Sequence, residues 1–204
     1  MANYIFQDLA KKGKAEGIDK ADNMKDARTW FRNVAQSVSS VNHQKMMNDK
    51  ENIRNSITAN DTGKMFMYFY DAKHKATLPY YDYFPLVFPL DFTPNGFMGI
   101  NLHYLPPVLR AKLMDAIYNT INNQKYDDST QLNISYSILK GASKYKYFQP
   151  CLKQYLWGHV ASKFMNVEPK NWDMALMLPL SRFRSNKTPI SSEKVWKDSI
   201  DSLK

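Results

Sequence analysis

Two stretches, Lys64-Met-Phe-Met-Tyr-Phe-Tyr70 and Tyr83-Phe-Pro-Leu-Val-Phe-Pro-Leu90, decide the fold of this chain. Both are rich in aromatic and apolar residues and neither has helical spacing, so we interpret each as a β-strand. Pro85 and Pro89 lack the N–H group that a sheet ladder needs. The second strand is therefore expected to lie at a sheet edge or to be irregular at its prolines.

A third strand follows a tight turn. Thr93-Pro-Asn-Gly96 is a strong turn signal, because an Asn-Gly pair tolerates positive φ. Residues 97–104 then form the returning strand. We expect residues 64–107 to make one antiparallel β unit that serves binding rather than chemistry.

Helical periodicity appears on both sides of this β unit. Apolar residues recur at helical spacing over residues 26–41, where Trp30 and Phe31 are the expected anchors to the core. Further helices are predicted over residues 108–121, 129–142 and 150–163.

Two short apolar pieces, residues 164–167 and 172–178, flank the turn-like Glu168-Pro-Lys-Asn171. We interpret them as a hairpin that adds two strands to the three central ones. Five strands suit a small barrel. The predicted fold class is α+β, a small antiparallel SH3-like β-barrel with inserted and flanking helices.

The expected organisation has three parts. Residues 1–24 form a flexible arm, because Gly13 and Gly17 interrupt a helix there and lysines alternate with acids. Residues 25–180 form a single α+β domain, and residues 181–204 form a basic tail that Trp196 and Leu203 can anchor. Within the domain, the β unit spans residues 64–107, the helical insertion 107–163 and the closing hairpin 164–178.

Composition excludes several classes of protein. The chain has 204 residues, of which 44% are hydrophobic and 14% aromatic, so it can bury a real core and is not disordered. Cys151 is the single cysteine, so no disulfide forms within the chain, and four scattered histidines do not make a zinc pattern. We expect no cofactor. No apolar run approaches the roughly 20 residues of a membrane span, and the first 20 residues have no signal-peptide core, so synthesis in the cytosol is expected.

The formal net charge is +9, from 28 Lys and Arg against 19 Asp and Glu. This excess predicts a polyanionic partner, with nucleic acid first and an acidic protein surface second.

Basic residues stand beside aromatic ones at two places. In the loop of residues 71–82, exposed tyrosines can stack on bases while lysines meet phosphates, or the tyrosines can simply wedge the loop against the core. The second place consists of Lys140, Lys144, Lys146 and Lys153 with Tyr145 and Tyr147, and it is equally well interpreted as a solvated face. The candidate DNA-binding residues are Lys73, His74, Lys75, Tyr80, Tyr81, Lys140, Lys144, Lys146, Arg182 and Arg184.

No catalytic constellation stands out. Cys151 and His159 lie eight residues apart on one predicted helix, a rise of roughly 12 Å, so they cannot touch and Cys151 is expected in the core. His103 is either a ligand contact or, as we favour, a histidine hydrogen-bonded to backbone inside the sheet.

A metal-dependent nuclease is the one enzyme to weigh. Asp71-Ala-Lys73 and Glu168-Pro-Lys170 each place an acid two residues before a lysine at a predicted strand end. Neither has a partner acid upstream in a strand, so the protein is not expected to be an enzyme.

Three central stretches carry a resemblance: Gly63-Lys-Met-Phe66, Tyr70-Asp-Ala-Lys-His-Lys-Ala-Thr-Leu-Pro-Tyr-Tyr-Asp82 and Gly96-Phe-Met-Gly-Ile-Asn-Leu-His-Tyr-Leu-Pro106. They resemble proteins of T4-like tailed phages, and the family is the DNA end protector. Phe148-Gln-Pro-Cys-Leu-Lys-Gln-Tyr-Leu156 and Trp172-Asp-Met-Ala-Leu-Met-Leu-Pro179 agree with it, so the similarity runs over about residues 26–196.

The resemblance implies a non-catalytic virion protein that is made in the host cytoplasm and added during head completion. Such a protein binds the ends of packaged linear double-stranded DNA and shields them from the host exonuclease. It implies other virion proteins as partners, with an oligomer possible and no membrane. It transfers no ligand residues. A structural neck, tail-terminator or baseplate component remains the alternative.

Overall fold

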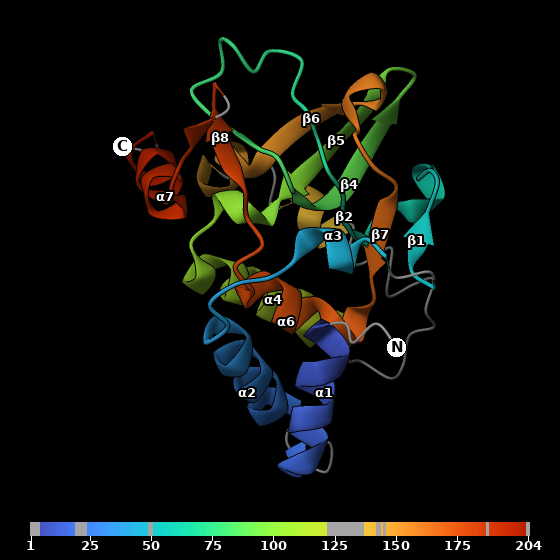
Figure 1. The fold of residues 1–204 in the computed structure, drawn as a ribbon, viewed down its shortest axis with the longest axis vertical. Helices are drawn as coiled ribbons and strands as arrows, with labels where there is room; N and C mark the ends of the chain where they lie inside the picture. The colour runs from blue at the N-terminus through green and yellow to red at the C-terminus, as the bar shows by residue number, and fades with distance from the viewer. Residues whose placement is uncertain are drawn as a thin grey trace.

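The computed structural model describes residues 5–18, 24–48, 51–121, 137–141, 144, 146–186 and 188–202. Within them the chain forms two antiparallel sheets and a layer of helices, so the α+β class is confirmed (Figure 1). The strands are β1 (Ile53–Arg54), β2 (Met65–Met67), β3 (Tyr81–Asp82), β4 (Leu86–Thr93), β5 (Gly96–Asn101), β6 (Leu152–Leu156), β7 (Phe164–Val167), β8 (Phe183–Ser185) and β9 (Thr188–Pro189).

The larger sheet has six strands in the order β1-β7-β2-β4-β5-β6, and the smaller sheet has the order β3-β8-β9. The helices are α1 (Ile5–Ala15), α2 (Met24–Gln36), α3 (His43–Met46), α4 (Pro107–Ile121), α6 (Trp172–Met177) and α7 (Ser192–Asp201). Figure 1 shows α1, α2, α4 and α6 gathered below the large sheet. Among the helices of the described residues, none combines the length and hydrophobicity needed to cross a bilayer.

The large sheet is buried on both faces. On the face of the sheet that the helices cover, Met65, Met67 and Phe69 belong to the main core. Phe66 and Tyr68 join a second, aromatic core on the opposite face, together with Tyr155 of β6. A strand covered on both sides has no polar face, which explains why residues 64–70 show no alternation of polar and apolar residues.

The predicted β unit is confirmed. The three expected strands correspond to β2, β4 and β5, and the turn at Pro94-Asn95 joins β4 to β5, with Thr93 paired to Gly96. β4 is central rather than at an edge. It tolerates Pro89 because the register shifts there, which leaves Leu90 as an extra, buried residue opposite β5.

Residues 150–163 do not form the predicted helix. Leu152–Leu156 is β6, which pairs with β5 along its whole length, and two short 3-10 helices flank it, η4 (Lys146–Cys151) and η5 (Trp157–His159). Short apolar runs are ambiguous between helix and strand, and the free edge of β5 decides this case.

The predicted closing hairpin is also wrong. β7 is a strand, but it pairs with β2 and β1, and the next apolar piece is the helix α6. The apolar residues of α6 are buried: Trp172, Met174, Ala175 and Leu176. A short helix that is enclosed by its neighbours has the same run of apolar residues as a buried strand, so the sequence did not distinguish the two. Among the described residues no closed barrel is found. The ladder ends at β1 and β6, and Tyr70 and Val160 form an isolated bridge.

The segments predicted as an arm and a tail contain secondary structure. Phe6 and Leu9 of α1 are buried, and Gly13 lies within that helix, where a Cβ would stand 2.9 Å from the Phe31 ring. Residues 183–201 contain β8, β9 and α7. The predicted anchor Trp196 donates from Nε1 to the His103 carbonyl oxygen at 2.9 Å, while Leu203 lies outside the described residues.

Gly96 is the tightest point of the sheet, since a Cβ there would lie 1.9 Å from the Tyr155 carbonyl oxygen. We predict that Gly96→Ala lowers the free energy of unfolding by about 3 kcal/mol, because backbone atoms of β6 must move. Urea unfolding measures the change. Gly158→Ala is the matched control, since a Cβ at Gly158 meets nothing within 4 Å. Equal stability of the two variants would contradict the close packing of β5 against β6.

Candidate nucleic-acid interface

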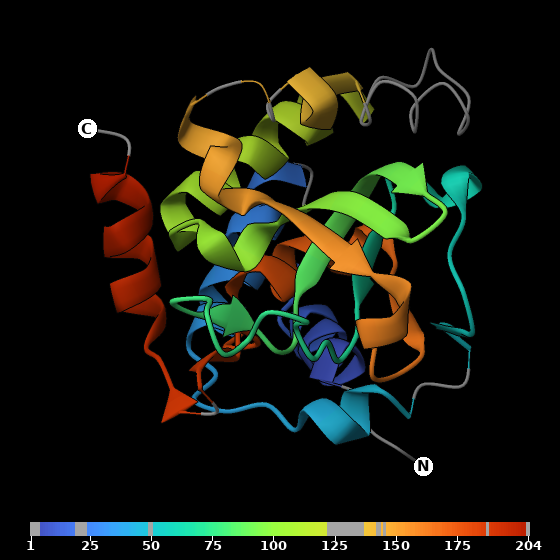
Figure 2. The same cartoon turned by 90° about the horizontal axis from the view of Figure 1, so that it is seen from above.

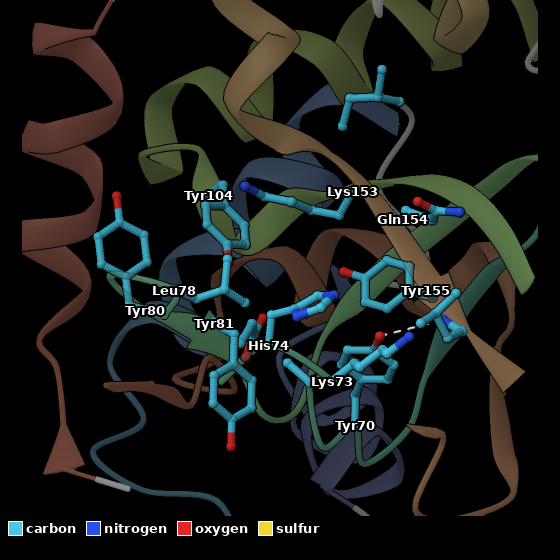
Figure 3. Close-up of a pocket in the computed structure, with 14 residues that line it drawn as sticks. Tyr70, Lys73, His74, Leu78, Tyr80, Tyr81, Tyr104, Lys153, Gln154 and Tyr155 are labelled. Atoms are coloured by element: carbon cyan, nitrogen blue, oxygen red, sulfur yellow. Dashed lines mark hydrogen bonds between the residues drawn. The ribbon is translucent and has the colours of Figure 1, made fainter. Parts of the chain in front are cut away.

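A cavity of about 310 Å³ lies between β6 and the loop of residues 71–80, here called the 71–80 loop (Figure 3). The loop follows Tyr70, after β2 of the large sheet, and leads into β3 of the small sheet. Five tyrosines line the cavity. Lys73 from the loop and Lys153 from β6 line it as well. The lining residues are Tyr70, Ala72, Lys73, His74, Leu78, Tyr80, Tyr81, Asp82, Tyr104, Leu152, Lys153, Gln154, Tyr155 and Leu156.

The inner wall of the cavity rests on the buried carboxylate of Asp82. Its Oδ1 accepts from the backbone N–H groups of Phe84 and Arg182, both at 3.1 Å. Its Oδ2 accepts from Asn101 Nδ2 at 3.0 Å and from His103 Nδ1 at 2.7 Å. These donors occupy both oxygens, so the carboxylate is satisfied by the protein itself.

Burial and hydrogen bonding set the charges of this network. Burial opposes ionisation of Asp82, but the His103 ring and the other donors outweigh it and hold the pKa of the carboxyl below its usual range. Burial lowers the pKa of His103, and Arg110 and Arg182 add to the effect against the opposing pull of Asp82. His103 is thus neutral near pH 7, with its proton on the Nδ1 that faces Asp82.

The buried Arg110 supplies the balancing positive charge. Its guanidinium donates to the carbonyl oxygens of Leu105 and Leu176, both at 2.7 Å, and of His103 at 3.2 Å. Burial lowers the pKa of Arg110 to about 10, so it stays cationic at neutral pH. His103 is buried, but the prediction that it bonds backbone inside the sheet is wrong. It lies in the 3-10 helix Leu102–Tyr104, just after β5, and its side chain bonds the Asp82 carboxylate.

Pairing of β3 with β8 brings two predicted arginines to the loop. Tyr81 is opposite Arg184, whose guanidinium lies 3.8 Å from the centre of the Tyr83 ring. Arg182 is exposed and donates from Nη2 to His43 Nδ1 at 3.3 Å. The backbone N–H of Arg182 also donates to Asp82, one hundred positions earlier in the chain, so the β8 segment is held next to the end of the loop.

The predicted loop residues divide into two groups. Lys73 and His74 are exposed at the lip of the cavity, whereas Lys75 is paired with Asp71 at 2.5 Å. Tyr80 is half-buried, with its ring centre 6.2 Å from that of Tyr104, and Tyr81 is buried. Both tyrosines wedge the loop against the core, as one of the two interpretations expected, and both line the cavity. Their stacking on bases stays a prediction.

Of the second predicted set, Lys153 lines the cavity, whereas Lys140, Lys144 and Lys146 do not. Lys140 pairs with Asp91 of β4 at 3.2 Å, and Lys144 and Lys146 are exposed on the segment before β6. Figure 2 shows β6 between that segment and the 71–80 loop. The side chains of Tyr145 and Tyr147 lie outside the described residues.

The role of β6 in the cavity could not be predicted from the sequence. Lys153 and Tyr155 stand two residues apart on one face of this strand, and Lys153 Nζ lies 4.0 Å from the centre of the Tyr104 ring. On the predicted helix these side chains would have pointed in different directions. The spacing Lys153-Gln-Tyr155 places the lysine and the tyrosine on one face of a strand. It indicates a shared site only once residues 152–156 are known to form a strand.

The geometry does not support a nuclease centre. Asp71 follows the end of β2, while Glu168 follows Val167, which pairs with Met65 at the start of β2. The two acids thus lie at opposite ends of the strand, and each is paired with a nearby lysine. Within the described ranges, no group of three His, Cys, Asp or Glu side chains could hold a metal ion. Cys151 is fully buried as predicted, and burial raises its pKa to about 12.

The fold and this surface define an α+β protein with cations arranged around an aromatic cavity, a combination suited to nucleic acid. A family model described as the phage T4 terminal DNA protecting protein matches residues 2–199. The chain belongs to this family of phage proteins that protect DNA ends. The comparisons with curated proteins and with solved structures found no match.

We predict that Asp82→Asn lowers the free energy of unfolding by ~3–5 kcal/mol near neutral pH, because it removes a buried charge from its donors. The folded-state pKa of Asp82 is lower than the unfolded value, so its contribution is present above about pH 4 and is lost as pH falls further. The gap between wild type and variant should therefore narrow below about pH 4.

Urea unfolding at a series of pH values measures this gap. Asp8→Asn, on the exposed face of α1, is the control and should change stability little at any pH. The wild type itself should lose stability below about pH 6.5, because His103 takes up a proton more easily when unfolded. A gap for Asp82→Asn that is constant with pH would contradict an ionised Asp82.

Proposed function

We propose that this chain is a non-catalytic virion protein that binds the ends of packaged linear double-stranded DNA and shields them from the host exonuclease during head completion. The observation that carries the proposal is the convergence of cations from three separate parts of the chain. Lys73 comes from the 71–80 loop, Lys153 from β6, and Arg182 and Arg184 from the segment around β8. Family membership supports the end-binding role.

The charges on this surface favour a polyanion. Asp82 offers no free acceptor to a ligand, since its oxygens are occupied by protein donors. Asp71 is paired with Lys75 and accepts from the Tyr81 hydroxyl at 3.3 Å, so it neutralises Lys75 and leaves the other cations available. Contacts of this type bind phosphates without reading base sequence.

The duplex extends beyond its end, and we place further contacts along it. Lys144 and Lys146, exposed on the segment before β6, meet phosphates more distant from the end. In the virion, other phage structural proteins are the neighbours of this chain, which is made in the host cytoplasm and joins the particle with the packaged DNA.

We predict that the combined change Lys73→Gln, Arg182→Gln and Arg184→Gln weakens binding to a linear duplex by at least ~10-fold at moderate salt. Each lost phosphate contact should reduce the slope of log affinity against log salt by about 0.9, so the slope should fall by about 2–3. Protection of the duplex from an end-dependent exonuclease should fall in parallel.

The matched control removes the same charge from α1, through Lys11→Gln, Lys12→Gln and Lys14→Gln. Figure 1 places α1 at the opposite end of the molecule from the 71–80 loop. This control should retain affinity and protection. A closed circular duplex is the competitor that tests for ends, and competition as strong as that of linear duplex would overturn the proposal.

A further inference from the structure

The cavity between β6 and the 71–80 loop has an unusual combination of walls. Buried tyrosine rings form its sides, with Tyr70, Tyr81, Tyr104 and Tyr155 each at most 6% exposed. Leu78, at 39% exposure, stands at the mouth. Figure 3 shows the ring of Tyr155 and the side chain of His74 pointing toward the space between loop and strand.

Lys153 is the residue of this wall that most directly indicates an anionic ligand. Its side chain is half-buried and its ammonium lies over the Tyr104 ring, yet it makes no ion pair among the residues that the structure describes. Burial lowers the pKa of this lysine, so the site would gain from a negative charge supplied by a ligand. Lys73 also lines the cavity, from the side of the loop.

The size of the cavity limits the ligand. About 310 Å³ is near the lower end of the range for small-molecule pockets, which admits one nucleotide-sized group rather than a stack of base pairs. The inner wall is closed by buried side chains, including Asp82 and Tyr155. A strand that enters the cavity therefore stops there, as the end of a strand does.

We propose that this cavity takes the terminal nucleotide of a DNA strand, with its base among the tyrosine rings and its phosphate at Lys153. The proposal rests on the end-binding function proposed above. The terminal base is stacked on one side only, so it leaves the duplex at lower cost than an internal base, which must be flipped out of two stacks. Aromatic rings then replace the lost stacking in a way that every base can use. The cavity would thus distinguish an end from the interior of a duplex.

The test uses duplexes that carry 5-iodouracil either at the terminal position or at an internal one. Irradiation crosslinks this base to aromatic side chains in contact with it. The expected result is strong crosslinking from the terminal position to peptides that contain Tyr81, Tyr104 or Tyr155, and at least ~10-fold less from the internal position.

Two variants probe the cavity itself. Leu78→Trp fills the mouth, and Lys153→Met removes the charge but keeps the length of the stem. Each should reduce the terminal crosslink at least ~5-fold and weaken end binding. Lys112→Met, which removes one exposed charge from α4, is the control and should change neither.

The outcomes separate the two proposals. Undiminished crosslinks in both cavity variants, or terminal crosslinks to peptides elsewhere, would overturn the cavity assignment while exonuclease protection still supports the function. Binding of a free deoxynucleoside monophosphate as tight as that of a duplex end would also overturn it, since the site would then recognise nucleotides rather than ends. Failure to protect linear duplexes at all would remove both.

Discussion

The structure depends on one buried carboxylate. Asp82 accepts hydrogen bonds from Phe84, Asn101, His103 and Arg182, which belong to segments far apart in the chain. An ionised carboxyl that is removed from water is tolerated only when its oxygens are fully hydrogen-bonded, so these segments must meet at one point. That meeting joins the small sheet to the end of β5, and with it fixes the inner wall of the cavity and the position of Arg184 beside Tyr81.

The same network reaches the helical layer. Arg110 of α4 holds three backbone carbonyl groups, one of them on His103, and Trp196 of α7 donates to that same His103 carbonyl oxygen. The ring of Trp196 also lies 5.4 Å from the Arg110 guanidinium. The part of the cationic surface around β8, with Arg182 and Arg184, is therefore built on a hydrogen-bonded support, which is what a precise binding site requires.

Much of the fold could be predicted from the sequence wherever the strand or turn preference of the residues agreed with the packing around them. The strands around Phe66, Phe88 and Ile100 and the turn at Asn95-Gly96 were predicted because their residues favour strands and turns in almost any setting. β6 and α6 were not, because short apolar runs take their structure from the neighbour that covers them. The loop cations and the arginines near β8 were predicted as site residues, but nothing in their spacing showed that β3 and β8 pair.

The long reach of the Asp82 network has a consequence for how the protein is made. Arg182 meets Asp82 across 100 residues, and Trp196 meets His103 across 93. The aromatic strands are synthesised before Arg182 and Trp196, whose hydrogen bonds complete this network. Contacts this distant in sequence slow folding, and the nascent β2–β5 unit exposes apolar surface on both faces in the meantime. Folding is therefore completed only once the segment containing Trp196 has been made, and a nascent chain shielded by chaperones would reach that point with less aggregation.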